Sequence, residues 1–461
     1  MSLIALVPIL RLLNKSNDLK YFASTGYIYG LFFYSLSIFW LNYNEGTSQF
    51  ISFITFTASV LYLSLFPMLI FLIFGIISKK IEKRFLVLPL IWVSIEYCNS
   101  LGQLGFPWFV IGAAMSSEYF PMQISEYTGV YGVSFWIILS NILFYLVIKK
   151  MSMKLATSTF IVLLSPFIIG LGIHAKSFDY GSKLKVGIVQ PDISQSIKWN
   201  KFRKNEIEEK LLSLTRNLFD RGAEIVFLPE SSIPGIVISG RTNSTINKLT
   251  NLIPNDELIV AGAMYRDNGK YYNSAIVIDS SGIADISSKL QLVPIAERVP
   301  LSNYFPILAN MNIGAGNFEP GDSIKILNYK DISFGAMICF ESIFSSLSSE
   351  FVNEKADFLV YLVNDGWYEK SPEPMQHFNH SIIRAIETRR NVVRVTNRGI
   401  SAVINEYGQV EEILDEYVDG TILATVSPIT YKTFYSKFGN LFAKFCMLFT
   451  FVMVFISIKR R

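Results

Sequence analysis

The side chain best suited to nucleophilic chemistry in this sequence is the thiol of Cys339. It follows the apolar run Ile332 to Ile338, which is typical of a strand, and polar residues come directly after it. Cys339 is therefore expected where a strand ends and a turn begins. Such a thiol can act as a nucleophile if a base removes its proton, because a free thiol has a pKa of about 8.5. A cysteine that only fills the core is the alternative.

The base that would serve this thiol must come from a small set of residues. The chain has three histidines, and His377 and His380 lie in one helical stretch, where they could be a base or metal ligands. We expect a solvated helix face instead, because no third ligand or orienting carboxylate has an obvious spacing. Glu230 follows the apolar strand 224–228, where open α/β sheets place reactive groups. It is either a carboxylate base or a simple strand-end cap.

The composition indicates an integral membrane protein. Of the 461 residues, 51% are hydrophobic and 17% are charged, and the mean hydropathy is +0.37. The net charge of +4 comes from lysine and arginine gathered at the ends of apolar runs, which is typical of membrane topology signals. We therefore expect membrane lipids as partners and no nucleic acid.

A membrane domain is predicted over residues 1–178, with about six apolar segments, and a last membrane helix over residues 438–458. The first run, 1–13, is short and is expected to be a shortened helix or a re-entrant segment. The loops 43–49 and 101–126 contain no lysine or arginine, whereas the loops that alternate with them are basic. By the positive-inside rule, the loops without lysine or arginine face away from the cytoplasm.

Residues 181–430 are polar enough to form a soluble domain. Apolar strand-like runs alternate there with helical patterns, which predicts a layered α/β fold. The helix at 155–174 begins in a basic loop and so delivers this domain to the extracytoplasmic side. Cys339 is the only thiol in the domain, since Cys98 and Cys446 lie in membrane segments. An unpaired thiol in an oxidising compartment is expected to be either buried or used.

Three motifs of this domain occur in the order and approximate separation of the Glu-Lys-Cys triad of the nitrilase superfamily. They are Phe227-Leu228-Pro229-Glu230, the stretch from Lys289 to Glu297, and Ile338-Cys339-Phe340-Glu341. With membrane helices on both sides of these motifs, the chain resembles the apolipoprotein N-acyltransferase family. The segments Tyr27 to Trp40, Trp92 to Glu96, Gly105 to Trp108 and Gly129 to Phe135 resemble the membrane half of that family.

The resemblance implies a polytopic helical membrane domain joined to an extracytoplasmic nitrilase-like αββα sandwich. It implies that Glu230 is the general base, Lys289 the oxyanion-stabilising cation and Cys339 the nucleophile. Glu297 and Glu341 match two supporting glutamates, and Trp367 matches an aromatic residue on a mobile loop. Surface charges and a core aromatic are the alternatives for these three.

The resemblance also implies an activity. An acyl chain would pass from a phospholipid donor to Cys339 as a thioester, and then to the α-amino group of a diacylated apolipoprotein acceptor, in a ping-pong reaction at the bacterial inner membrane. We expect no cofactor and no metal. The alternatives are a membrane-tethered carbon-nitrogen hydrolase or amidase that uses water, and a non-catalytic membrane scaffold.

Six residues depart from the pattern of that family. Some replace aromatic or hydroxyl-bearing side chains, and others change the size or charge of the side chain: Leu228, Ala296, Arg298, Phe340, Gly366 and Arg398. Glu230, Lys289 and Cys339 are all present, so the departures bear on loop mobility and donor preference and not on whether the chemistry can occur. The apolar stretches 233–238 and 304–308 are expected to be loops over the site.

Overall fold

Two compact units make up the chain in the computed structural model, which describes residues 1–78, 84–198, 200–302, 317–368 and 371–459. The helical unit consists of Met1–Asn42, Gln49–Lys176 and Phe438–Arg461, and the sandwich unit consists of Tyr43–Ser48 and Ser177–Lys437. The segment Tyr43–Ser48 therefore belongs with the sandwich unit, although it connects two helices of the helical unit.

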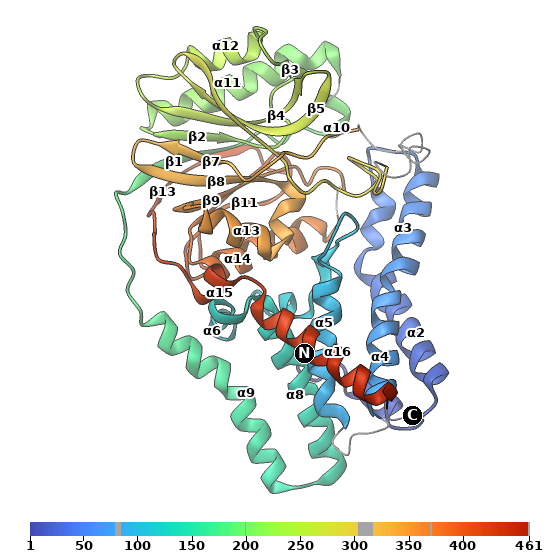
Figure 1. Cartoon of the computed structure of the whole chain (residues 1–461). Helices are drawn as coiled ribbons and strands as arrows, with labels where there is room; N and C mark the ends of the chain where they lie inside the picture. Colours follow the sequence, from blue (N-terminus) through green and yellow to red (C-terminus); the bar gives the residue numbers. More distant parts are fainter. Residues whose placement is uncertain (79–83, 199, 303–316, 369–370, 460–461) are drawn as a thin grey trace. The chain divides into compact units, whose positions relative to one another are not determined.

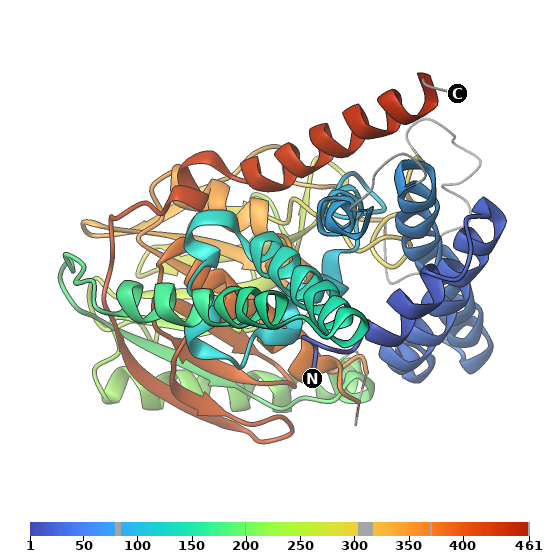
Figure 2. The ribbon, with the colours of Figure 1, turned by 90° about the horizontal axis from the view of Figure 1, so that it is seen from below.

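The helical unit is built almost entirely from apolar helices. They are α1 (Val7–Leu13), α2 (Leu19–Ser37), α3 (Gln49–Leu63), α4 (Leu65–Ser78), α5 (Leu88–Cys98), α6 (Tyr119–Met122), α7 (Ser125–Thr128), α8 (Val130–Lys150), α9 (Met153–His174) and α16 (Leu441–Lys459). Among the described residues, four stretches are long and apolar enough to cross a membrane: Gln49–Ser78, Val130–Lys150, Met153–His174 and Leu441–Lys459. α8 and α9 lie side by side, and α8 ends at the left-handed residue Met151 (Figures 1 and 2).

Two mixed sheets form the centre of the sandwich unit. The first has the order β13-β1-β2-β4-β5-β6 with β3 beside β4, and the second has the order β12-β11-β10-β9-β8-β7. The strands of the first sheet are β1 (Leu184–Gln190), β2 (Ile225–Leu228), β3 (Ile236–Ile238), β4 (Leu258–Asp267), β5 (Lys270–Asp279), β6 (Gly282–Ser288) and β13 (Gly420–Val426). Those of the second are β7 (Ile326–Tyr329), β8 (Ile332–Ile338), β9 (Phe358–Val363), β10 (Val392–Thr396), β11 (Ser401–Ile404) and β12 (Val410–Leu414).

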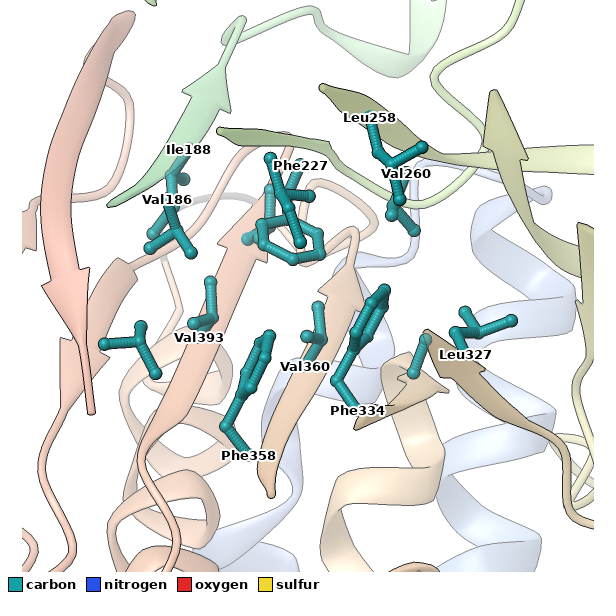
Figure 3. Packing of buried hydrophobic residues seen from close by; sticks show 14 of the residues in the cluster. Val186, Ile188, Phe227, Leu258, Val260, Leu327, Phe334, Phe358, Val360 and Val393 are labelled. Carbon is teal, nitrogen blue, oxygen red and sulfur yellow. The ribbon is translucent and has the colours of Figure 1, made fainter. Parts of the chain in front are cut away.

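The main hydrophobic core lies between the facing surfaces of these two sheets. Val186, Ile188 and Phe227 project from the first sheet toward Phe334 and Phe358 of the second (Figure 3). The rings of Phe227 and Phe334 meet edge to face, with their centroids 5.9 Å apart. This interdigitation holds the carboxyl ends of β2 and β8, which carry the site, in a fixed relation to each other.

Helices cover the outer face of each sheet. α11 (Lys204–Asp220) and α12 (Ser244–Thr250) lie over the first sheet, and α13 (Ser345–Asn353) and α14 (Glu373–Thr388) lie over the second (Figure 1). Two short helices, α10 (Gln195–Lys198) and α15 (Phe434–Phe438), complete the unit. The predicted αββα sandwich is confirmed. The membrane face on which it lies stays a prediction.

Candidate active site

Cys339 lies at the first residue after β8, in a backbone conformation that few side chains adopt. Its φ is +51°, in the left-handed region, and a short 3-10 turn, Cys339–Ile343, begins there. The thiol is half-buried, and the hydroxyl of Ser342 donates to the carbonyl of Cys339 at 2.9 Å. Strained residues of this kind are typical of functional sites, because the surrounding structure must hold them in place.

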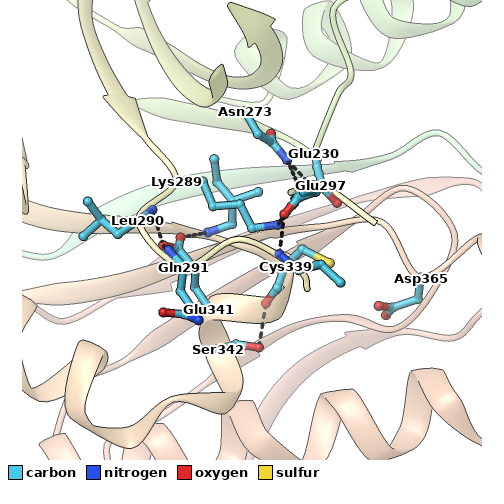
Figure 4. A network of polar contacts seen from close by, with 12 residues as sticks. Glu230, Asn273, Lys289, Leu290, Gln291, Glu297, Cys339, Glu341, Ser342 and Asp365 are labelled. Atoms are coloured by element: carbon cyan, nitrogen blue, oxygen red, sulfur yellow. Dashed lines mark hydrogen bonds and ion pairs between the residues drawn. The ribbon is translucent and has the colours of Figure 1, made fainter. Parts of the chain in front are cut away.

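The carboxylate of Glu341 holds this turn. One oxygen accepts the N–H of Ile338 at 2.7 Å, and the other accepts the N–H groups of Leu290 and Gln291 at 2.7 and 3.1 Å (Figure 4). Burial raises the pKa of Glu341 to about 7, although these three donors oppose that rise. Glu341 thus joins the turn that carries Cys339 to the segment that carries Lys289, rather than lying on the surface.

Glu230 lies just beyond the carboxyl end of β2, as its strand-end position predicts. The backbone of β4 passes very close to it, because a Cβ atom added to Gly262 would lie 2.5 Å from the Cα of Glu230. One carboxylate oxygen, Oε1, accepts a hydrogen bond from Nδ2 of Asn273 at 2.7 Å. The other, Oε2, is buried and has no hydrogen-bond partner among the described residues. Glu230 therefore has one oxygen held in place and one able to accept a proton.

Lys289 follows β6, and its ammonium lies between two carboxylates. Nζ is 2.9 Å from Oε2 of Glu297 and 3.8 Å from Oε1 of Glu230. The side chain of Lys289 is only 1% exposed. Burial opposes its charge, but the carboxylates of Glu297 and Glu230 raise the pKa of Lys289 above its usual value. The ammonium is therefore a fixed positive charge beside the base.

Asn273, in β5, is a site residue that the sequence did not identify. Its Nδ2 donates to Oε1 of Glu230 at 2.7 Å and to Oε1 of Glu297 at 3.0 Å. The amide thus bridges two carboxylates that would otherwise repel each other. Glu297 also accepts the N–H of Val293 at 2.8 Å, so it serves as the anchor of Lys289 and Asn273.

The electrostatic surroundings of Cys339 keep its thiol protonated in the resting site. Burial raises the pKa of Cys339 well above its usual value, the charge of Glu230 raises it further, and Lys289 opposes the rise. Burial likewise raises the pKa of Glu230 above its usual value, which makes this carboxylate a stronger base. The arrangement in Figure 4 brings a thiol, a base and a cation from three separate segments into one site.

The prediction that His377 and His380 lie on a solvated helix face is wrong. Both are buried in α14, with exposures of 1% and 3%. Nδ1 of His377 bonds to Oδ1 of Asp365 at 2.7 Å, and its Nε2 lies 3.1 Å from the carbonyl of Cys339 and 2.7 Å from the hydroxyl of Ser342. Asp365 is the orienting carboxylate that sequence spacing did not reveal, and His377 supports the turn that begins at Cys339 through its contacts with Ser342 and the Cys339 carbonyl.

Asp365, Glu373 and His377 are the described residues that could hold a metal ion, since their ligand atoms lie within 4.8 Å of one another. Asp365, however, already accepts a hydrogen bond from Arg394 at 2.8 Å, and His377 is engaged through both ring nitrogens. Arg394 and His377 hold the pKa of Asp365 below its usual value against the effect of burial. These contacts favour a hydrogen-bonding network over a metal site.

Trp367 lies just after β9, where it meets the segment Tyr43–Ser48. The N–H of Glu45 donates to the carbonyl of Trp367 at 3.0 Å. A Cβ atom added to Gly46 would lie 2.7 Å from the Trp367 ring, so glycine is needed for this approach. Trp367 is thus neither a core aromatic nor a free loop residue, because it packs against a segment 320 positions away in the chain.

Several departures from the family pattern have structural explanations. Leu228 is part of the core beneath α11 and α12, and Phe340 packs edge to face on Phe344 with centroids 5.2 Å apart. At position 366, an added Cβ atom would lie 3.0 Å from the Cβ of Arg398, so glycine suits the close approach of Arg398.

The other departures and the two expected loops give a mixed result. Arg298 forms an ion pair with Glu319 at 2.6 Å, whereas nothing in the structure explains Ala296. Part of the expected loop 233–238 is the strand β3, while 304–308 lies outside the described residues.

Comparison with known proteins gives two family matches that together span most of the chain. A model of carbon-nitrogen hydrolases matches residues 185–434, and a model of the apolipoprotein N-acyltransferase N-terminal domain matches residues 1–143. The chain is similar to the apolipoprotein N-acyltransferase of Geobacter metallireducens, with 27% identity over 99% of this chain and 91% of that protein. It is 30% identical to the enzyme of that name from Shewanella oneidensis, over 82% of this chain and 76% of that protein. A solved nitrilase-superfamily protein of Saccharomyces cerevisiae is 19% identical with a TM-score of 0.43, over 55% of this chain and 93% of that one.

Proposed function

Because this chain belongs to the apolipoprotein N-acyltransferase family, a branch of the carbon-nitrogen hydrolases, we propose that Glu230, Lys289 and Cys339 are its catalytic triad. N-acylation of lipoproteins is the function that goes with this family. The single observation that best supports the triad is the convergence of these residues from three separate segments on one buried network, in which Oε2 of Glu230 has no hydrogen-bond partner among the described residues.

In the first half-reaction, Oε2 of Glu230 accepts the thiol proton of Cys339. The sulfur then attacks the carbonyl carbon of the sn-1 ester of a phospholipid, and the charge that develops on the carbonyl oxygen is balanced by the ammonium of Lys289. When the carbon–oxygen bond of the ester breaks, Glu230 returns the proton to the departing oxygen. The products are a lysophospholipid and an acyl thioester on Cys339.

In the second half-reaction, the acceptor is the α-amino group of an S-diacylglyceryl cysteine at a lipoprotein N-terminus. Its nitrogen attacks the thioester carbonyl and loses a proton to Glu230, while Lys289 again balances the oxyanion. Breaking of the carbon–sulfur bond yields the amide, and Glu230 reprotonates the thiolate of Cys339. Each group of the triad thus returns to its starting state.

The chain is a multi-pass membrane protein, and the bacterial inner membrane is its proposed location. The alternation of basic loops with loops that lack lysine and arginine supports a catalytic domain, residues 181–430, on the extracytoplasmic side between a membrane domain, 1–178, and a last membrane helix, 438–458. Both substrates are lipids held in a membrane, which explains why a nitrilase-like sandwich is joined to apolar helices.

The test is to incubate the purified full-length protein with a radiolabelled phospholipid and a diacylated lipopeptide. Transfer of label to the peptide is expected, whereas release of free fatty acid would indicate a hydrolase and no reaction a scaffold. Without acceptor, label should be trapped on the protein in Cys98→Ala but not in Cys339→Ala. Transfer that survived in Cys339→Ala would refute the proposed nucleophile.

A further inference from the structure

A second ammonium group, that of Lys198, lies beside the catalytic base. Lys198 is the last residue of α10, it is half-buried, and its Nζ donates to the backbone carbonyl of Glu230 at 3.0 Å. Within the described part of the chain, this is the one hydrogen bond found for the ammonium, and no carboxylate forms an ion pair with it. Two of its three N–H donors are therefore unused.

Lys198 also lines a pocket on the sandwich unit. The walls are mainly apolar and come from four parts of the unit: Pro191, Ile193, Ile207, Leu211, Ile233 and Met264. Two of the polar groups at this pocket have partners already, since the hydroxyl of Ser232 donates to the carbonyl of Gly262 and the amide of Asn397 donates to the carbonyl of Ile193. The ammonium of Lys198 is the pocket's uncommitted charged group.

The two lysines near Cys339 thus differ in their charge balance. The charge of Lys289 is balanced by the carboxylates of Glu297 and Glu230. In the proposed mechanism its ammonium contacts the carbonyl oxygen of the reacting ester. Lys198 forms no ion pair with a carboxylate among the described residues. Burial lowers its pKa to about 8, even though Glu230 and Cys339 raise it. A half-buried ammonium without an anion is unfavourable, so a bound anion would stabilise this pocket.

We propose that Lys198 binds the phosphodiester of the donor phospholipid, while the apolar walls of its pocket contact the lipid chain next to it. This inference rests on the proposed function, because it assigns the donor specificity of that same site. A phosphodiester carries one negative charge and strong acceptor oxygens, which match the two unused donors of an ammonium. The acceptor half-reaction involves no phosphodiester, so Lys198 acts only when the thioester forms.

The test compares two acyl donors that differ in whether they carry a phosphate. Thioester formation on Cys339 is measured with a phosphatidyl donor and with the p-nitrophenyl ester of the same fatty acid. In Lys198→Met, kcat/KM for the phospholipid is expected to fall about 10- to 100-fold, the effect of losing a charge-assisted contact, whereas the rate with the p-nitrophenyl ester changes less than about twofold. Lys198→Arg should restore most of the phospholipid rate.

Two results would overturn the inference. Equal losses with both donors would mean that Lys198 only positions Glu230 through its carbonyl, and an unchanged phospholipid rate would mean that it does not touch the donor. The unchanged p-nitrophenyl reaction also reports that the variant is folded, and Lys183→Met, an exposed lysine before β1, is the matched control. If the wild-type protein formed no thioester with either donor, the proposed function itself would fail.

Discussion

Removing the amide of Asn273 is expected to slow thioester formation and to shift its pH dependence. Nδ2 of Asn273 donates to Glu230 at 2.7 Å and to Glu297 at 3.0 Å, and Asn273→Ala removes both contacts without enlarging any side chain. A hydrogen bond to a charged group contributes about 1.5–3 kcal/mol. If one such contribution is lost from the transition state, the rate falls about 10- to 100-fold.

The same change has a defined effect on the acid side of the pH profile. The hydrogen bond from Asn273 lowers the pKa of Glu230, while burial raises it. Without that bond, the pKa of Glu230 rises further, so the carboxylate binds its proton over a wider range of pH. Glu230 must be ionised to accept the thiol proton, and the acid limb of the thioester rate is therefore expected to move to higher pH.

The assay is a rapid-quench measurement of label on Cys339 across the pH range, with acceptor absent. Asn217→Ala serves as the matched control. Asn217 is an exposed asparagine of α11, and its side chain accepts one exposed hydrogen bond, from Arg221. An acid limb that stays in place, together with a rate within about threefold of wild type, would refute the bridging role of Asn273. A loss of rate with an unmoved limb would indicate that Asn273 does not act through Glu230.

Three further predictions follow from contacts around the site. Glu341→Gln replaces an acceptor of three backbone N–H groups by an amide with one acceptor oxygen, so Tm and thioester formation should both fall; a wild-type Tm would contradict this role. Gly46→Val places a side chain against the Trp367 ring, at a cost of about 1–3 kcal/mol. The resulting loss of acylation rate should be smaller when Trp367→Ala is also present. Strictly additive effects of the two changes would show that the contact between these residues does not matter for the rate. Gly366→Ala should lower Tm, and this loss should be smaller in an Arg398→Gly background, where the Cβ atom it meets is absent; an equal loss in both backgrounds would show that the two residues are not coupled.

Much of the sandwich could be predicted from the sequence, because its central strands are apolar over their whole length. The strand predicted over 332–338 has these bounds, and the strand predicted over 224–228 begins one residue later, at Ile225. β6, β7, β12 and β13 were not predicted, and they are the outermost strands of the two sheets, with exposed or half-buried residues among their side chains. A strand without a buried apolar run carries no periodic signal, so only its pairing with a neighbour reveals it.

The site was predictable only where a local motif carries it. Glu230 and Cys339 each follow an apolar strand, and their neighbours resemble family motifs. Asn273 lies in the middle of β5, and nothing near it in the sequence indicates that two carboxylates approach from other segments. The orientation of His377 by Asp365 is equally invisible, since β9 and α14 bring the two together only in the folded chain. Contacts of this kind arise when separate strands and helices pack together, and the spacing of residues along the sequence does not reveal which elements will meet.

The charges of the site explain how one lysine can serve every step. Before reaction, the negative charge nearest to Lys289 besides that of Glu297 is on Glu230, 3.8 Å from Nζ. When Glu230 takes the thiol proton, that charge passes to the sulfur and then to the oxyanion, so the number of negative charges around Lys289 never changes. A fixed ammonium can balance each state without moving, which keeps reorganisation small. The carboxylate of Glu297 and the amide of Asn273 are what hold the ammonium and the base in this relation.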